Sequence, residues 1–198
     1  MPKPVKADNV TQEFPDARQS PPMARVWDPF VRVFHWSLVT SFLVAWLTSH
    51  DAETIHYWAG FAAAGLVGLR LLWGFIGTPY ARFSHFVRHP RHVMEYLRAI
   101  ASGSEARHLG HNPAGGAMIV ALLLAMSATA LTGWLMTTDA FWGVWWMQKL
   151  HDLVAHGLLL LVLVHLGGVV LASLRHKENL VLAMISGRKR RPEPGDIH

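Results

Sequence analysis

The chain has 198 residues, of which 52% are hydrophobic and 16% charged, and its mean hydropathy is +0.24. A soluble domain carries about a quarter charged residues, so the composition indicates a membrane protein with a single domain. There is no cysteine, which excludes disulfides, c-type haem attachment and cysteine-ligated iron–sulfur clusters within the chain. The net charge of +5 does not indicate nucleic-acid binding, because the basic residues lie at the edges of apolar segments.

The first 24 residues are polar and proline-rich, so we expect a disordered cytoplasmic tail rather than a signal peptide. Four apolar runs follow, and each is close to the length of about 20 residues that a membrane-spanning helix needs. These runs cover 31–48, 55–77, 114–136 and 150–174. The sequence therefore predicts an all-α fold, an integral membrane four-helix bundle over residues 25–190, with a cytoplasmic tail at 191–198.

The connection between the second and third runs is long and basic, and we expect a further helix in it after Pro90. There, Val93, Tyr96, Leu97 and Ile100 share one helical face, which predicts a short amphipathic helix. The segment after Glu178 has a similar pattern. Such helices lie either on the inner membrane surface, in contact with lipid, or in solvent, and the sequence leaves both open.

The distribution of Lys and Arg predicts the orientation of the chain. Five lie in the N-terminal segment as far as Arg32, five in the long second connection and six after the fourth run, whereas the third connection has only Lys149 and the first has none. We therefore expect a multi-pass protein of the bacterial inner membrane with both termini in the cytoplasm. The tryptophans of the third connection fit an aromatic belt at the outer interface.

Four histidines, His35, His56, His151 and His165, lie at informative depths within the apolar runs, where ionisable groups are rare and usually functional. His151 and His165 are fourteen residues apart, so they project from one helical face and lie about 21 Å apart along the axis. His35 has the depth of His165 on the cytoplasmic side, and His56 has the depth of His151 on the outer side. Imidazoles from different helices are axial ligands of b-type haem iron, so the sequence predicts two haem b groups, one for each pair.

Other residues of the second run support this interpretation. His56, Gly60, Ala64 and Gly68 form one ridge, and small residues below a ligand leave room for a macrocycle; the alternative is close packing of two helices. Arg70 is a candidate partner for a haem propionate, and the alternative is that its side chain reaches the membrane interface. The third run has no histidine, so we expect it to pack on the outside of the haem sites.

Three further histidines have competing interpretations. His50, near the outer end of the first run, is an alternative to His56 as an outer ligand. His156 faces away from His151, which favours a packing role. His111 precedes Asn112 and Pro113 at the start of the third run, where it is a candidate for lining a quinone pocket; the alternative is an ordinary loop histidine or helix cap.

These residues resemble the bacterial di-haem cytochrome b family, the group of cytochromes b561 and nickel-hydrogenase b-type cytochrome subunits. The resemblance spans about 25–190 and is carried by Val26-Trp27-Asp28, Arg32-Val33-Phe34-His35-Trp36, His56-Tyr57-Trp58-Ala59-Gly60, Arg70-Leu71-Leu72-Trp73-Gly74, His111-Asn112-Pro113-Ala114-Gly115-Gly116, and His151 with His165. It implies two b haems, ubiquinone or menaquinone as substrate, and a hydrogenase, dehydrogenase or c-type cytochrome as redox partner. It also implies a polar quinone contact at Asn112, and it leaves a homodimer open.

The sequence thus favours transmembrane electron transfer between the quinone pool and a partner redox protein, as a subunit of a quinone-linked oxidoreductase. A histidine-lined membrane metal transporter or metal-binding protein is the alternative. Divalent-metal transport usually needs carboxylates along the path, and here Asp51, Glu53 and Asp152 lie only at helix ends. A structural anchor with incidental histidines is a third hypothesis, which the matched depths disfavour.

Overall fold

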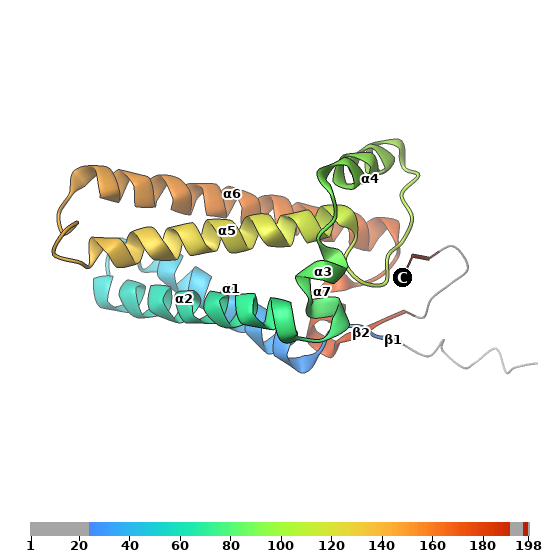
Figure 1. The fold of residues 1–198 in the computed structure, drawn as a ribbon, viewed down its shortest axis with the longest axis horizontal. Coiled ribbons are helices and arrows are strands. Elements are labelled where there is room, and N and C mark those ends of the chain that lie inside the picture. The colour runs from blue at the N-terminus through green and yellow to red at the C-terminus, as the bar shows by residue number, and fades with distance from the viewer. Residues whose placement is uncertain (1–23, 191–195, 198) are drawn as a thin grey trace, which may run out of the picture.

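The computed structural model describes residues 24–190 and 196–197. Four long helices run side by side along the molecule (Figure 1). They are α1 (Pro29–Leu47), α2 (Glu53–Ile76), α5 (Pro113–Met136) and α6 (Trp145–Arg175). Each is long and apolar enough to cross a membrane, which confirms the predicted all-α bundle of four membrane helices. The predicted tails lie outside the described residues at 1–23, 191–195 and 198.

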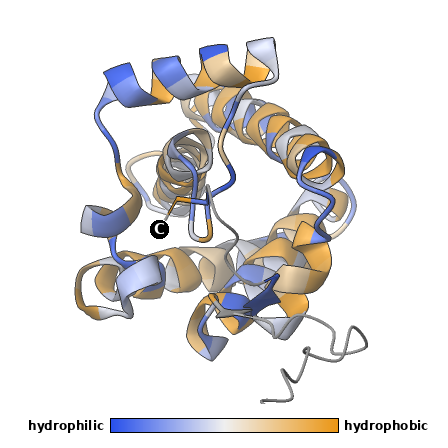
Figure 2. Ribbon diagram, turned by 90° about the vertical axis from the view of Figure 1, so that its right-hand side faces the viewer, coloured by the Kyte–Doolittle hydropathy of each residue, from blue (hydrophilic) through white to orange (hydrophobic). Residues whose placement is uncertain are grey.

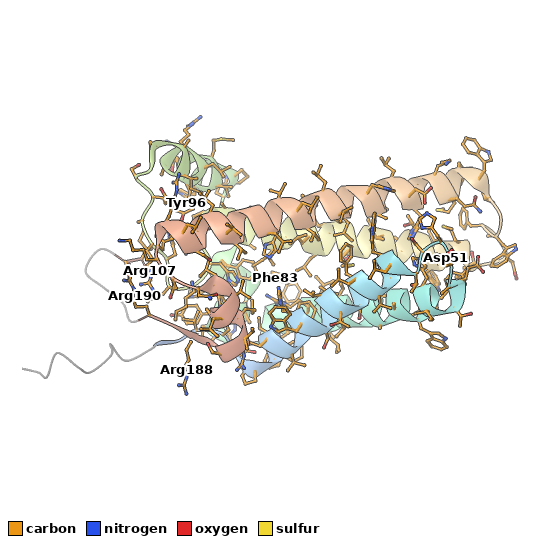
Figure 3. The ribbon with its side chains drawn as sticks, turned by 180° about the vertical axis from the view of Figure 1, so that it is seen from behind. Asp51, Phe83, Tyr96, Arg107, Arg188 and Arg190 are labelled. Carbon is orange, nitrogen blue, oxygen red and sulfur yellow. The ribbon has the colours of Figure 1, made fainter. Side chains whose placement is uncertain are left out.

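The remaining elements gather at one end of the bundle (Figure 1). They are β1 (Ala24–Arg25), the 3-10 helix η1 (Pro79–Ala81), α3 (Phe83–Phe86), α4 (Pro90–Ser102), α7 (Leu180–Ser186) and β2 (Arg188–Lys189). The opposite end has only the short connections between α1 and α2 and between α5 and α6. We call these the basal end and the short-loop end; Figure 3 labels Arg107 and Arg190 at the first and Asp51 at the second.

The helix starts follow from local sequence chemistry. The Asp28 carboxylate accepts a hydrogen bond from the Val31 backbone N–H at 2.8 Å, and Pro29 occupies the first turn. The Asn112 side-chain oxygen accepts one from the Gly115 N–H at 2.6 Å, again with a proline next. Side chains of this type satisfy the free N–H groups at a helix start, and proline is preset for the helical φ. These caps fix where α1 and α5 begin, and therefore the register of His35 and the position of His111.

The fourth helix is longer than its apolar run predicts. It begins at Trp145 rather than near Leu150, so Trp145 and Trp146 belong to its first turn and not to the connection. Both side chains are exposed, 73% and 46% respectively, as is Trp142 in the turn before them. Large apolar side chains also point outward along the bundle, as expected of helices that face lipid.

The basal end joins the two ends of the chain. Strands β1 and β2 pair antiparallel, with Ala24 opposite Lys189, so Ala24 is part of the fold although the predicted tail extended to it. Arg107 is buried in ion pairs with Glu178, at 3.1 Å, and with Asp196. Ile197 forms a bridge with the chain near His108. The last described residues therefore pack on the long loop instead of extending from the molecule.

The helix after Pro90 is present as predicted and packs beside the start of α5. Tyr96 is buried, Val93 and Ile100 are half-buried, and Leu97 is 44% exposed. Hydrophilic and hydrophobic residues alternate along α4 (Figure 2), and its exposed Arg91 and Glu95 side chains form an ion pair at 3.0 Å. The segment after Glu178 also forms a short helix, α7, as its pattern predicts.

Candidate functional site

Two of the predicted ligand histidines face each other near the short-loop end. The ring centroids of His56, on α2, and His151, on α6, are 6.2 Å apart, and their planes are nearly perpendicular at 87°. Two imidazoles on opposite sides of one metal ion, each bonded at about 2 Å, have ring centres roughly 6 Å apart. The separation in this short-loop pair therefore fits axial coordination of one iron.

The hydrogen bonds of both rings are made by Nδ1 and leave Nε2 free. The His56 Nδ1 lies 2.7 Å from the carbonyl oxygen of Ala45, and a carbonyl only accepts, so Nδ1 carries the proton. The His151 Nδ1 lies 3.0 Å from the Thr132 hydroxyl oxygen. In both rings the contact is made by Nδ1, so Nε2 is the nitrogen left to bind a metal. Histidine ligands are commonly oriented by such a bond from the other ring nitrogen.

The second pair lies nearer the basal end. His35 is in the second turn of α1, and His165 is on α6, the helix that also carries His151. The His35 Nδ1 is buried and has no hydrogen-bond partner among the described residues. A buried nitrogen without a partner is costly, so this basal pair is chemically incomplete as the chain alone presents it.

The helix that carries His151 and His165 stays apart from the two helices that carry their predicted partners. Close packing joins α1 to α2, α2 to α5 and α5 to α6, whereas α6 does not pack extensively on α1 or α2 among the described helices. Each histidine pair joins α6 to one of those two helices. The ligands thus come from helices whose backbones stay apart, which is what a flat group held between them requires.

A buried layer separates the two pairs. Leu158 is 1% exposed and lies seven residues from His151 and seven from His165, two helical turns in each direction. It packs in the core with Phe34 of α1, Val67 of α2 and Met126 of α5. Apolar side chains from all four helices therefore divide the bundle interior into two levels.

Arg70 is buried beneath the long connection that follows α2. Its side chain is only 3% exposed, and its Nη2 donates to the Ala81 carbonyl at 3.0 Å. The guanidinium lies over the rings of Phe83, at 5.4 Å, and Phe86, at 6.0 Å. Its Nη1 is buried without a hydrogen-bond partner in the described structure. A cation held this way offers one strong donor to an anionic group, such as a carboxylate.

His111 lies at the same end, between two aromatic rings. Its ring centroid is 4.6 Å from that of Trp27 and 4.9 Å from that of Phe86. Burial, with the positive charges of Lys189, Arg70 and His85, lowers the pKa of His111 to about 3, so the ring is neutral at physiological pH. The Nδ1 is buried and has no partner within the described part of the chain.

A cavity of about 290 Å³ opens beside His111. Its lining includes Tyr80, His85, Arg88, His92, His108 and His111. Imidazole, phenol and guanidinium groups are hydrogen-bond donors, and the described lining contains no carboxylate. Asn112 does not line the cavity, because its side-chain oxygen caps α5.

The remaining predicted residues occupy different environments. His50 is exposed and its Nδ1 lies 3.0 Å from the hydroxyl of Ser49, whereas His56 is the histidine that faces His151. His156 is also exposed, with Nδ1 2.7 Å from the Asp152 carbonyl and its ring edge against Trp46, a packing role.

The small residues of the α2 ridge do not bring two helices together. A Cβ built on Gly60 or on Gly68 would meet nothing within 4 Å. The buried face of α2 is the neighbouring one, formed by Ala59, Ala63 and Val67. Close packing therefore does not explain the ridge, and space remains beside it.

The histidines form pairs, not larger clusters. Among the described residues no group of three or more His, Asp or Glu side chains is placed to hold a metal ion. A transported divalent cation usually takes several oxygen and nitrogen ligands, so the geometry favours haem over the metal-transport alternative.

Three residues that sequence reasoning did not select surround the histidines. Thr132 and Gly133, on α5, contact His151, so α5 supports a site that we expected it only to cover. No motif marks a Thr-Gly pair in an apolar helix. Leu158, in contrast, was detectable, because it lies midway between two histidines on one helical face.

Comparisons with known proteins identify the family of the chain. The model of the family described as prokaryotic cytochrome b561 matches residues 26–187. The chain is 22% identical over 215 aligned positions to a probable Ni/Fe-hydrogenase B-type cytochrome subunit of Bradyrhizobium diazoefficiens, covering 85% of this chain and 86% of that protein. No solved structure gives a significant match.

Proposed function

The chain belongs to the prokaryotic cytochrome b561 family, a group of b-type haem electron-transfer proteins of membranes, and from that premise we propose that it holds two haems and exchanges electrons with quinone at one level and a redox protein at the other. The observation that carries this proposal is the facing pair His56 and His151, with centroids 6.2 Å apart and both Nε2 atoms free.

The residues fit two b-type haems. His56 and His151 would hold one iron, and His35 and His165 the other, each through Nε2. Bound haem supplies one-electron transfer at its iron. Arg70, with its unpartnered buried Nη1, would bind a propionate of the basal haem. The open side of Gly60 and Gly68 would receive the edge of a macrocycle.

The basal end suits a quinone. A quinone has two carbonyl oxygens that accept hydrogen bonds, and the neutral, buried His111 beside the cavity offers a ring N–H that the described fold does not use. Asn112 adjoins it, although its oxygen caps α5, so any contact with quinone would come from its amide nitrogen. Ubiquinone and menaquinone both present these carbonyls, and we propose one of them as substrate.

The short-loop end suits a protein partner. Its connections are short, and Trp142, Trp145 and Trp146 are exposed in or next to the connection between α5 and α6. The relative named a probable Ni/Fe-hydrogenase cytochrome subunit supports a hydrogenase as the partner, with a dehydrogenase or c-type cytochrome as other members of the same class. The Lys and Arg distribution supports a bacterial inner membrane location with both termini cytoplasmic, which puts the basal end inside.

Haem stoichiometry tests the proposal directly. The purified protein should contain two haems per chain by pyridine haemochrome assay. His35→Ala or His165→Ala should leave one haem, and His56→Ala or His151→Ala should leave the other. His50→Ala is the matched control for the outer ligand and should retain both. A wild-type ratio near one, or loss of haem in His50→Ala but not in His56→Ala, would refute these assignments.

The quinone site has its own test. In His111→Ala and Asn112→Ala, both haems should be retained while reduction by a quinol analogue slows, more in the His111 variant because Asn112 has a capping role. His50→Ala, which alters an exposed histidine at the short-loop end, is the control and should leave the reduction rate unchanged. Unchanged reduction rates in both variants would refute a quinone site at the basal end. A periplasm-active reporter fused to the C-terminus should be silent if the basal end is cytoplasmic.

A further inference from the structure

We propose that Thr132 is a positioning residue for the His151 haem ligand, because its hydroxyl accepts the Nδ1 proton of His151 and so aims Nε2 into the bundle. This inference rests on the proposed function, in which His151 binds haem iron. It adds a residue from α5, the helix without histidines.

The direction of the hydrogen bond follows from the other partners of the hydroxyl. Thr132 Oγ1 lies 2.9 Å from the Ala128 carbonyl oxygen and 3.0 Å from the Thr129 carbonyl oxygen. A hydroxyl has one proton, and a carbonyl can only accept, so the Thr132 proton is directed to its own helix. The contact of 3.0 Å with His151 Nδ1 then has the ring N–H as donor. The tautomer of His151 is thereby fixed with Nε2 unprotonated.

The neighbouring residue limits where the ring can lie. A Cβ added to Gly133 would come within 3.1 Å of His151 Cε1, tighter than an ordinary van der Waals contact. Thr132 is 7% exposed, so water does not compete effectively for its hydroxyl. One residue of α5 therefore orients the imidazole by a hydrogen bond, and the next allows the ring to approach by having no side chain.

The same bond would set the electronic character of the ligand. An imidazole whose Nδ1–H donates to a good acceptor is a more basic ligand, and a more basic ligand favours oxidised iron over reduced iron. His56 makes its corresponding bond to the backbone carbonyl of Ala45, which a side-chain substitution leaves in place. A substitution at Thr132 would therefore change the basicity of a ligand of the outer haem, whereas no side-chain substitution removes the acceptor that His56 uses.

The experiment compares hydroxyl-free and hydroxyl-retaining variants of the full-length haem protein. Thr132→Val and Thr132→Ala should raise the midpoint potential of the outer haem by up to about 59 mV, which is about a tenfold change in the equilibrium constant for one-electron reduction. They should also alter its low-spin electron paramagnetic resonance signal. Thr132→Ser should keep both near wild type. Ser127→Ala, which removes a hydroxyl that bonds only the Leu123 carbonyl in the described structure, is the control on the same helix.

The outcomes separate this inference from the proposed function. Selective loss or weakened retention of the outer haem in the hydroxyl-free variants, with retention in Thr132→Ser, also supports the positioning role. An unchanged potential and spectrum in Thr132→Val and Thr132→Ala would overturn it, as would equal loss of both haems in all three variants. If His151→Ala retains two haems, the ligand assignment itself fails. If His151→Ala loses one haem while Thr132→Val behaves as wild type, only the role of Thr132 fails.

Discussion

The two histidine levels of the bundle differ in how far the chain completes them. At the short-loop end, the Nδ1 atoms of His56 and His151 both have hydrogen-bond partners within the protein, and the rings stand 6.2 Å apart. At the basal end, the Nδ1 of His35 is buried without a partner in the described residues, as are Nη1 of Arg70 and Nδ1 of His111. The outer level is held by the protein, whereas the basal level presents polar groups that need partners from elsewhere.

This difference is what the proposed division of roles requires. Hydrogen bonds within the protein hold the geometry of a ligand pair when the iron gains or loses an electron. Such a fixed site suits electron exchange with a docked protein. Buried groups without partners are expensive unless something binds them, and a haem propionate and a quinone head group are both of the right chemistry. We therefore expect substitutions at the basal level to act through what binds there, and substitutions at the outer level to act through ligand geometry.

The largest effect should come from removing the layer that keeps the two levels apart. Leu158→Ala removes a side chain that is 1% exposed, and a cavity of this kind costs about 2–5 kcal/mol in free energy of unfolding. The matched control is Leu160→Ala, whose side chain is 62% exposed and should change stability by no more than about 0.5 kcal/mol. Unfolding in detergent, followed by haem absorbance, measures both. Equal free energies of unfolding for the two variants would contradict the role of Leu158 in a buried layer between the two histidine pairs.

A smaller effect should distinguish the levels electrostatically. Arg70→Gln removes a buried cation near the basal haem, which makes electron uptake less favourable there. We expect the midpoint potential of the basal haem to fall by up to about 59 mV, which is about a tenfold change in the equilibrium constant for its reduction. The midpoint potential of the outer haem should not change. The control Arg91→Gln removes a cation that is 80% exposed on α4 and should alter neither. A shift confined to the outer haem would place Arg70 at the wrong level.

The smallest expected effect concerns His111, whose imidazole should not change its protonation state near neutral pH. Because burial lowers the pKa of His111 to about 3, its imidazole should stay neutral between about pH 5 and 8. Its nitrogen resonances in ¹⁵N-histidine-labelled protein should not move over that range, and His111→Gln identifies them. The unfolded chain binds this proton below an ordinary pKa of 6.5, so folding stability falls as pH drops from there towards 3, by about 1.4 kcal/mol per unit. A transition near pH 6.5 would show that the ring is solvated.

The sequence alone predicted the helices and two of their most informative relationships. Four apolar runs matched the four membrane helices to within a few residues, apart from the start of α6. The facing of His56 and His151 followed from depth, since helical rise converts residue number into position along the axis. The amphipathic helix after Pro90 followed from its periodicity. Helix period and rise are local properties, so an unaligned sequence contains them.

What surrounds each histidine was decided only by the tertiary structure. Thr132 lies nineteen residues before His151 in the chain, and the Ala45 carbonyl eleven before His56. No spacing rule predicts these contacts, because they depend on how two helices rotate against each other when the core around Leu158 packs. The same holds for the buried ends of Arg70 and His111, which follow from where the long loop folds back. The periodicity of the chain determined which histidines share a level, and the packing of the bundle determined which nitrogen of each ring is left free.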